Sequence, residues 1–218
     1  LIFSLIFLLA GCMSFNKVEL GDLFKKEPKF YSAGGTENSK NQIIVLPLRG
    51  MIIPYAPKNS FLQDNYITPE QIAQNLMIIK RMPGVKALVL EIQSPGGSAA
   101  ASEEILQMFK NFKNETKIPI VAYFGEITAS GGYYIAQAAD KIIANPNNLT
   151  GSIGVISIFP NVGNFLKNKL DIEIVSIKSG QFKDAGSFLR KMSDQEKEYW
   201  QSMTMMYYER FVEIVAEG

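Results

Sequence analysis

Short apolar runs alternate with longer amphipathic stretches along most of the chain after residue 42. Residues 43–48 (IIVLPL), 87–92 (ALVLEI) and 118–124 (IPIVAYF) are predicted as strands, because they are short, apolar and rich in β-branched side chains. The second run is almost continuously apolar, which is typical of a parallel strand covered on both faces. Pro47 cannot donate a ladder hydrogen bond, so the first strand is expected at an edge or to end early.

Helices are predicted between these strands. A capping box that begins at Thr68, with a proline at the first helical position, starts a helix that continues to about residue 82. Apolar residues at helical spacing predict another helix across residues 105–112. Because strands and helices alternate, the predicted fold class is α/β, with a mainly parallel sheet and helices outside.

The same alternation continues in the second half of the chain with shorter elements. Helices are predicted at residues 130–139 and 165–170, and strands at residues 141–144 and 172–177, with another short apolar run at residues 155–158. A last helix begins with a capping box at Ser193. Its broad apolar face is expected in the core or in a subunit contact, and it carries Tyr199, Met203, Met206, Tyr207, Phe211 and Val215.

The N-terminal 41 residues have a different character. Residues 1–10 (LIFSLIFLLA) are uncharged and apolar, but they are about half the length of a membrane span and predict the core of a signal peptide. The sequence LAGC ending at Cys12 resembles the lipobox of bacterial lipoproteins, so Cys12 is expected to carry lipid. A longer uncleaved anchor and a chance cysteine are the alternatives.

The predicted organisation is a signal segment over residues 1–12, a polar tether over 13–41 and one folded domain over 42–218. The sequence starts at Leu1, inside the apolar run, and the last helical pattern stops at Gly218. We therefore expect the sequence to be truncated at both ends.

Composition excludes several kinds of site. The 22 Lys and Arg residues balance 21 Asp and Glu to a formal charge of +1, so no nucleic-acid partner is expected. The chain has no histidine, which excludes a Ser-His-Asp triad and a histidine-built metal site. Cys12 is the single cysteine and cannot form an internal disulfide. We expect no metal and no cofactor, and a catalytic base would have to be Lys, Asp, Glu or Tyr.

Candidate chemistry follows two of the predicted strands. Gly96-Gly97 and Gly131-Gly132 each lie where a strand leads into a helix, the edge at which open α/β sheets bind ligands. Glycine lets a backbone N–H approach a ligand closely, and two such groups can form an oxyanion hole. A plain turn is the alternative for the first pair.

Ser130 precedes the second glycine pair and resembles a nucleophile elbow in its placement, although the residue two before it is Thr128 rather than glycine. Its alternative role is that of a simple helix N-cap. A serine nucleophile without histidine needs a lysine made neutral by burial. Lys141, Lys178 and Lys183 lie near strand ends, and their spacing does not choose among them.

Three stretches resemble the signal peptide peptidase A, or protease IV, family of bacterial serine peptidases, related to Clp protease and crotonase folds. They are ALVLEIQSPGGS, ITASGGYYIAQAADKIIANPNNLTGSIGV, and IKSGQFKDAGS followed by the helix SDQEKEYWQSM. They occur in the family's order, and the resemblance extends over residues 43–218. It implies a Clp protease-like or crotonase-like fold built from repeated ββα units.

The resemblance also implies roles for single residues. Ser130 matches the family's nucleophile, Lys183 its general base, and the N–H groups of Gly97 and Gly131 its oxyanion donors. Ser152 matches a serine that orients the lysine. The chain departs from the family where Gly186-Ser187-Phe188-Leu189-Arg190 replaces the usual Gly-Ser-Pro-Phe-Arg, so the loop of the base is expected to differ in shape.

The function that the resemblance implies is a membrane-tethered endopeptidase that cleaves remnant signal peptides on the extracytoplasmic side of a bacterial membrane. Its expected partners are peptide substrates, the membrane, and copies of itself in a homo-oligomer whose sites take serine and lysine from neighbouring subunits. A crotonase-like acyl-CoA enzyme and an inactive scaffold of the same fold are the alternative functions.

Overall fold

The computed structural model describes residues 34–35, 39–56 and 66–218, and the chain divides into one unit up to Glu37 and another over Asn38–Gly218. The signal segment, Cys12 and most of the tether lie outside the described residues. All of the described helices and strands belong to the second unit. Within the described part, no helix is both long and apolar enough to cross a bilayer.

A parallel sheet forms the centre of this unit, with the strand order β1 (Gln42–Arg49), β4 (Val85–Ser94), β5 (Ile120–Ala129) and β6 (Lys141–Ala144). A further strand, β7 (Leu149–Gly151), pairs with the end of β5 beyond β6. β1 lies at the edge, as its proline predicts, and every pairing in the sheet is parallel. The predicted α/β class is confirmed, while β7 was not predicted.

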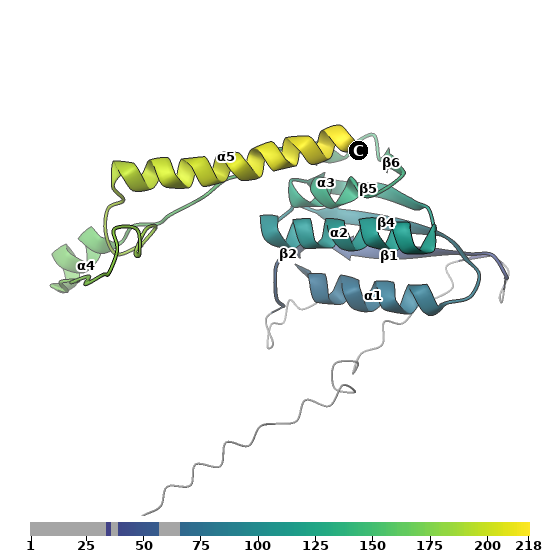
Figure 1. Ribbon diagram of the computed structural model, residues 1–218, viewed down its shortest axis with the longest axis horizontal. Helices are drawn as coiled ribbons and strands as arrows, with labels where there is room; N and C mark the ends of the chain where they lie inside the picture. The colour runs from purple at the N-terminus through teal and green to yellow at the C-terminus, as the bar shows by residue number, and fades with distance from the viewer. Residues whose placement is uncertain (1–33, 36–38, 57–65) are drawn as a thin grey trace, which may run out of the picture. The chain divides into compact units, whose positions relative to one another are not determined.

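Three helices cover one face of the sheet and lie side by side (Figure 1): α1 (Pro69–Arg81), α2 (Ala99–Thr116) and α3 (Gly131–Ala136). The predicted capping box is present at Thr68, where the hydroxyl accepts from the Gln71 N–H at 3.2 Å. Phe109 and Phe112 of α2 and Phe124 of β5 are the largest of the fully buried side chains among the described residues. Their packing fixes the helices against the sheet.

The other face of the sheet is partly open. β4, the strand predicted to be covered on both faces, is buried on one face and half-buried on the other over residues 87–92. Burial alternates strictly along β1, where Ile44, Leu46 and Leu48 are buried but Ile43 is 67% exposed. Tyr123 of β5 is also exposed. On this face, β1 and β5 have apolar side chains that the described residues leave exposed to solvent.

A small second sheet joins the chain after β1 to the chain before α1. β2 (Met51–Ile52) pairs in parallel with β3 (Tyr66–Ile67), and Ile52 also forms an isolated bridge with Gly97. This bridge fixes the loop after β4 to the chain that follows β1. It places Gly97 at the carboxyl end of the main sheet.

The C-terminal part contains α4 (Gly163–Leu170) and α5 (Asp194–Glu217), as predicted. Residues 172–177 form no strand, so this prediction is wrong, and the apolar run at residues 155–158 forms none either. Both runs are apolar and β-branched, but neither has a neighbouring strand among the described residues, and Ile177 is 95% exposed. A strand needs a partner for its backbone hydrogen bonds, which the sequence pattern of one segment cannot supply.

The last helix begins at the predicted capping box, where Ser193 and Glu196 bond each other's backbone N–H. The apolar face of this helix is buried only near its C-terminal end, where Phe211 and Ile214 are the buried residues. Tyr199, Met206 and Tyr207 are exposed, so their predicted place in a core is wrong for the single chain. A subunit contact stays the open alternative for them.

Candidate active site

Ser130 stands at the turn from β5 into α3 in an unusual backbone conformation. Its φ is 50° and its ψ is −122°, a region that L residues rarely occupy and that stores strain. Its side chain makes no capping hydrogen bond, so Ser130 does not act as a side-chain N-cap of α3. The turn is held by hydrogen bonds from Ser130 N to Gly151 O and from Tyr134 N to Ser130 O, both 2.9 Å. The strained turn leaves the hydroxyl of Ser130 without a local structural task.

Gly97 and Gly131 lie at the same place for a steric reason. A Cβ on Gly131 would lie 3.3 Å from Gly97 N and would overlap Ser102 Oγ, while a Cβ on Gly97 would overlap the carbonyl oxygen of Ile52. Only glycine therefore permits these two backbone segments to pack as closely as they do. The two predicted oxyanion donors come from neighbouring segments, one after β4 and one at the first residue of α3.

Ser130, Gly97 and Gly131 line one cavity of about 710 Å³. Its wall is largely apolar and continues through Val155, Ile156 and Phe211. A cavity of this kind, with a few polar groups at one place, is typical of a site that takes an apolar segment of a ligand. The structure thus brings together three of the predicted site residues.

A charged network that sequence reasoning missed lines the same cavity. Tyr134 donates a hydrogen bond to the carboxylate of Glu103, and Arg210 of α5 pairs with that carboxylate at 3.4 Å. Burial acts to raise the pKa of Glu103, but the hydrogen bonds from Tyr134, Gln107 and Arg210 outweigh it and lower the pKa. Burial, and then the bond to Glu103, raise the pKa of Tyr134. Glu103 is therefore an anion that links α2, α3 and α5.

Lys183 does not line this cavity. It lies in an exposed turn between α4 and α5, and its Nζ has no hydrogen bond or ion pair with any described residue. This turn lies beyond the N-terminal end of α5, whereas α3 contacts α5 near the other end (Figure 1). Within one chain, the predicted base and the predicted nucleophile are not brought together.

The other two lysine candidates differ from Lys183. Lys178 forms an ion pair with Asp184 at 2.5 Å, and Lys141 is exposed in β6. Ser152, the residue expected to orient the lysine, has a φ of 52° and directly follows the Gly151 carbonyl that accepts from Ser130 N. Ser152 is thus near the Ser130 turn along the backbone, but it does not line the cavity.

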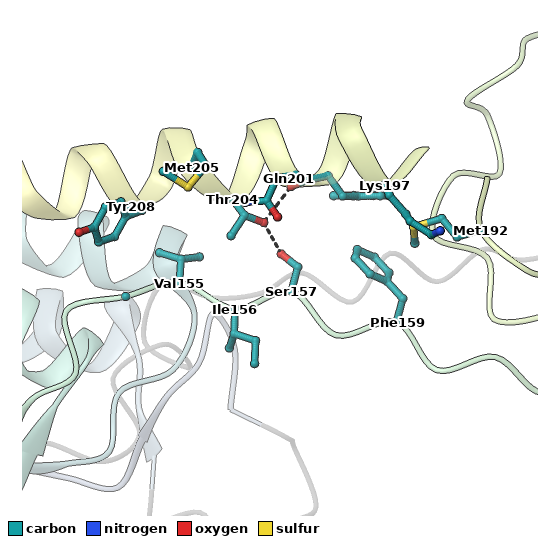
Figure 2. Close-up of a pocket in the computed structure, with 12 residues that line it drawn as sticks. Val155, Ile156, Ser157, Phe159, Met192, Lys197, Gln201, Thr204, Met205 and Tyr208 are labelled. Atoms are coloured by element: carbon teal, nitrogen blue, oxygen red, sulfur yellow. Dashed lines mark hydrogen bonds between the residues drawn. The ribbon is translucent and has the colours of Figure 1, made fainter. Parts of the chain in front are cut away.

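A second hollow, of about 640 Å³, lies between residues 154–159 and the first half of α5 (Figure 2). Figure 2 shows Ser157 of the extended segment facing Thr204 of α5, and their hydroxyls share a hydrogen bond of 2.9 Å. Gly154, Val155 and Ile156 line both this hollow and the cavity of Ser130. The two spaces therefore share one extended stretch of backbone as a wall.

The Ser130 cavity holds several chemical groups. They include the Ser130 hydroxyl, two backbone N–H groups and the Glu103 network, and the side chains of Ser98, Ser102, Glu104 and Tyr207 also line it. In the described part of the chain, no three His, Cys, Asp or Glu side chains cluster so as to hold a metal ion. The hydroxyl and the N–H groups suit an attack on a carbonyl with a developing negative charge.

Comparison with known proteins adds an independent line of evidence. Residues 112–218 match peptidase family S49. A proposed signal peptide peptidase, SppA, of Enterococcus faecium is 37% identical over 180 residues, which are 83% of this chain and 52% of that protein. Protease 4 of Haemophilus influenzae is 33% identical over 181 residues, 83% of this chain and 28% of that protein.

The chain spans about half or less of the length of these curated relatives. Among solved structures, a mutant of ClpP1 from Listeria monocytogenes aligns with a TM-score of 0.46 and 16% identity, covering 79% of this chain and 70% of that one.

Proposed function

Because this chain belongs to the SppA, or protease 4, family of serine peptidases, we propose that it is an endopeptidase with Ser130 as nucleophile and Lys183 as general base. The observation that carries the proposal is the strained turn of Ser130, beside the backbone N–H groups of Gly97 and Gly131 in one cavity.

The proposed reaction has two halves. Ser130 Oγ attacks the carbonyl carbon of the scissile peptide bond while neutral Lys183 takes the hydroxyl proton. The N–H groups of Gly97 and Gly131 hold the oxyanion that forms, and Lys183 then passes its proton to the departing amine. The same lysine then takes a proton from a water molecule, whose oxygen attacks the acyl-enzyme carbonyl. As the bond from that carbon to Ser130 Oγ breaks, the lysine returns the proton to Oγ and regenerates the hydroxyl.

The position of Lys183 supports a site shared between copies of the chain. Lys183 is exposed in the turn that precedes α5 and does not line the cavity, so we propose that a second copy supplies the lysine of each site. Exposed apolar side chains over residues 153–188 support the same assembly, because such surfaces mark protein contacts. In the assembled site, Ser152 would orient the incoming lysine.

Substrates and location complete the proposal. We propose that the substrates are signal peptides left in the membrane, which the apolar wall of the Ser130 cavity would accommodate. Lipid on Cys12 would tether the protein on the extracytoplasmic side of the membrane. Metabolic labelling with a fatty-acid analogue should mark the full-length protein but not Cys12→Ser, and absence of label in the wild type would replace the lipid by a simple anchor.

A serine-directed phosphonate probe tests the nucleophile directly. The wild type should be labelled, Ser130→Ala should not, and Lys183→Ala should be labelled far more slowly because its serine has no base. A crotonase-like enzyme or an inactive scaffold would leave Ser130 unlabelled in every variant. That result would end the peptidase proposal.

A mixing experiment tests the shared site. Ser130→Ala and Lys183→Ala protomers are each expected to be inactive, but their mixture should recover activity because some sites then contain both intact groups. Mixed-tag pull-down must confirm subunit exchange. Confirmed exchange with no recovery would show that each site is built within one chain.

A further inference from the structure

The turn that carries Lys183 is short and is held mainly by its own backbone. Lys183 N donates to Gly180 O at 3.2 Å, Ala185 N to Phe182 O at 3.1 Å, and Ser187 N to Asp184 O at 3.0 Å. The Lys183 side chain contributes nothing to this turn. Before Lys183, Gln181 donates to Gln195 and the Phe182 ring stacks on that of Tyr199, both in α5. After Lys183, the next residue, Asp184, ties the turn to Arg190.

Arg190 holds Asp184 in a two-pronged contact. Its Nε donates to Asp184 Oδ2 at 2.9 Å and its Nη2 to Asp184 Oδ1 at 2.7 Å. Paired bonds of this kind fix the direction of a carboxylate as well as its distance. Lys178 adds a further contact to Asp184 Oδ1 at 2.5 Å, and the combined bonds, first those of Arg190, depress the pKa of Asp184.

The same guanidinium also forms hydrogen bonds with a side chain at the start of α5. Arg190 Nη1 donates to Glu196 Oε2 at 2.9 Å, and Nη2 donates to the other oxygen of Glu196. Glu196 is buried and accepts the Ser193 N–H at 2.8 Å as part of the helix capping box. The bond from Arg190, and then that from Ser193, lower the pKa of Glu196 to about 2. Glu196 is thus a charged anchor at a rigid helix end.

We propose that Arg190 is a positioning residue, which fixes the turn of Lys183 against α5 by joining Asp184 to Glu196. The inference rests on the proposed role of Lys183 as base. It gives a physical reason for a fully engaged guanidinium seven residues after the lysine, in the loop where this chain departs from the family's usual Gly-Ser-Pro-Phe-Arg. Arginine is required because lysine cannot bond two carboxylates with a planar fork.

The expected effect is on the chemical step. A general base must lie within hydrogen-bond reach of the proton it takes, and a misplacement of about 1 Å can reduce the rate about 100-fold. Arg190→Lys keeps the positive charge but loses the fork, so kcat should fall about 10- to 100-fold while KM changes less than about twofold. Asp184→Asn should show the same split, because it weakens the other half of the link. Arg49→Lys is the matched control, since Arg49 makes one exposed contact with Glu91 at 3.0 Å and should keep full activity.

A double variant separates positioning from general damage. If Arg190 acts through the lysine, adding Arg190→Lys to Lys183→Ala should not slow the residual phosphonate labelling of Ser130 any further. If Arg190 only stabilises the fold, the double variant should be slower than Lys183→Ala alone. Fluorescence of Trp200, the single tryptophan, reports whether the start of α5 stays folded in each variant.

Three results would overturn the inference: unchanged kcat in both Arg190→Lys and Asp184→Asn, a parallel loss of kcat and Trp200 packing, or additive losses in the double variant. Failure of the proposed function has a different signature. In that case Lys183→Ala would keep the wild-type rate of Ser130 labelling, whatever the Arg190 variants show.

Discussion

Replacing Gly97 by alanine should remove one oxyanion donor with limited damage to the core. A Cβ at this position would overlap the carbonyl oxygen of Ile52 and come within 2.8 Å of Ile52 N, so the loop must retreat by about 1 Å. Two hydrogen bonds of 2.9 Å, Ser98 N to Ile52 O and Ile52 N to Gly96 O, now hold the loop in place and would lengthen. The Gly97 N–H would then no longer reach the oxyanion.

Loss of one such donor costs about 2.7–4 kcal/mol in the transition state, or about 100- to 1,000-fold in kcat. The assay is peptide hydrolysis by the full-length protein, with thermal unfolding measured on the same samples. Gly125→Ala is the matched control, because its Cβ would meet its nearest neighbours at 3.7 Å and fits without a shift. If the folded Gly97→Ala protein keeps more than about a third of the wild-type kcat, Gly97 is not an oxyanion donor.

Three further predictions concern the base, the start of α5 and the core. Lys183→Arg should be inactive in peptide hydrolysis, because arginine keeps its proton and cannot act as a base; most of the wild-type rate would exclude the mechanism. The lowered pKa of Glu196 stabilises the fold above the ordinary value of about 4.3, and this contribution is lost as the pH falls toward about 2. Trp200 fluorescence should therefore change in that window, and a change complete above pH 5 would contradict the assignment. Phe109→Ala should lower the free energy of unfolding by about 3–5 kcal/mol in denaturant titration, since Phe109 is fully buried; a loss below about 1 kcal/mol would contradict its place in the core.

Several elements were predictable because their signals are local. The capping boxes at Thr68 and Ser193 depend on residues three positions apart, and both are present as predicted. The buried strands are short apolar runs whose partners lie in the same chain. Pro47 marked β1 as an edge strand because a proline has no N–H to donate.

Predictions failed where the outcome depends on a neighbour that the segment itself does not specify. Residues 155–158 and 172–177 have the composition of strands, yet neither pairs with another strand in the described chain. The strand β7 was missed for the converse reason. Its three residues carry little pattern of their own, and it exists because it extends the ladder at the end of β5.

The site residues also differ in whether local sequence marks them or only packing brings them together. Ser130 and the two glycine pairs were candidates because they lie near the ends of predicted strands, with a helix N-cap and a plain turn as alternatives. Their catalytic roles came from the family resemblance. Glu103, Tyr134 and Arg210 lie on three different helices, and only their packing brings them to one network. The spacing of these residues along the chain does not predict that contact.

Lys183 presents the hardest case, because spacing did not choose it and its own chain does not place it beside Ser130. The structure narrows the choice by engaging Lys178 with Asp184 and leaving Lys183 unpaired among the described residues. Residues 153–188, which include this lysine, also carry exposed apolar side chains. Their apolar runs at 155–158 and 172–177 pair with no strand in the described part of the chain. A second copy that packs on residues 153–188 would account for both features, because one contact would cover the apolar runs and deliver a lysine to a serine.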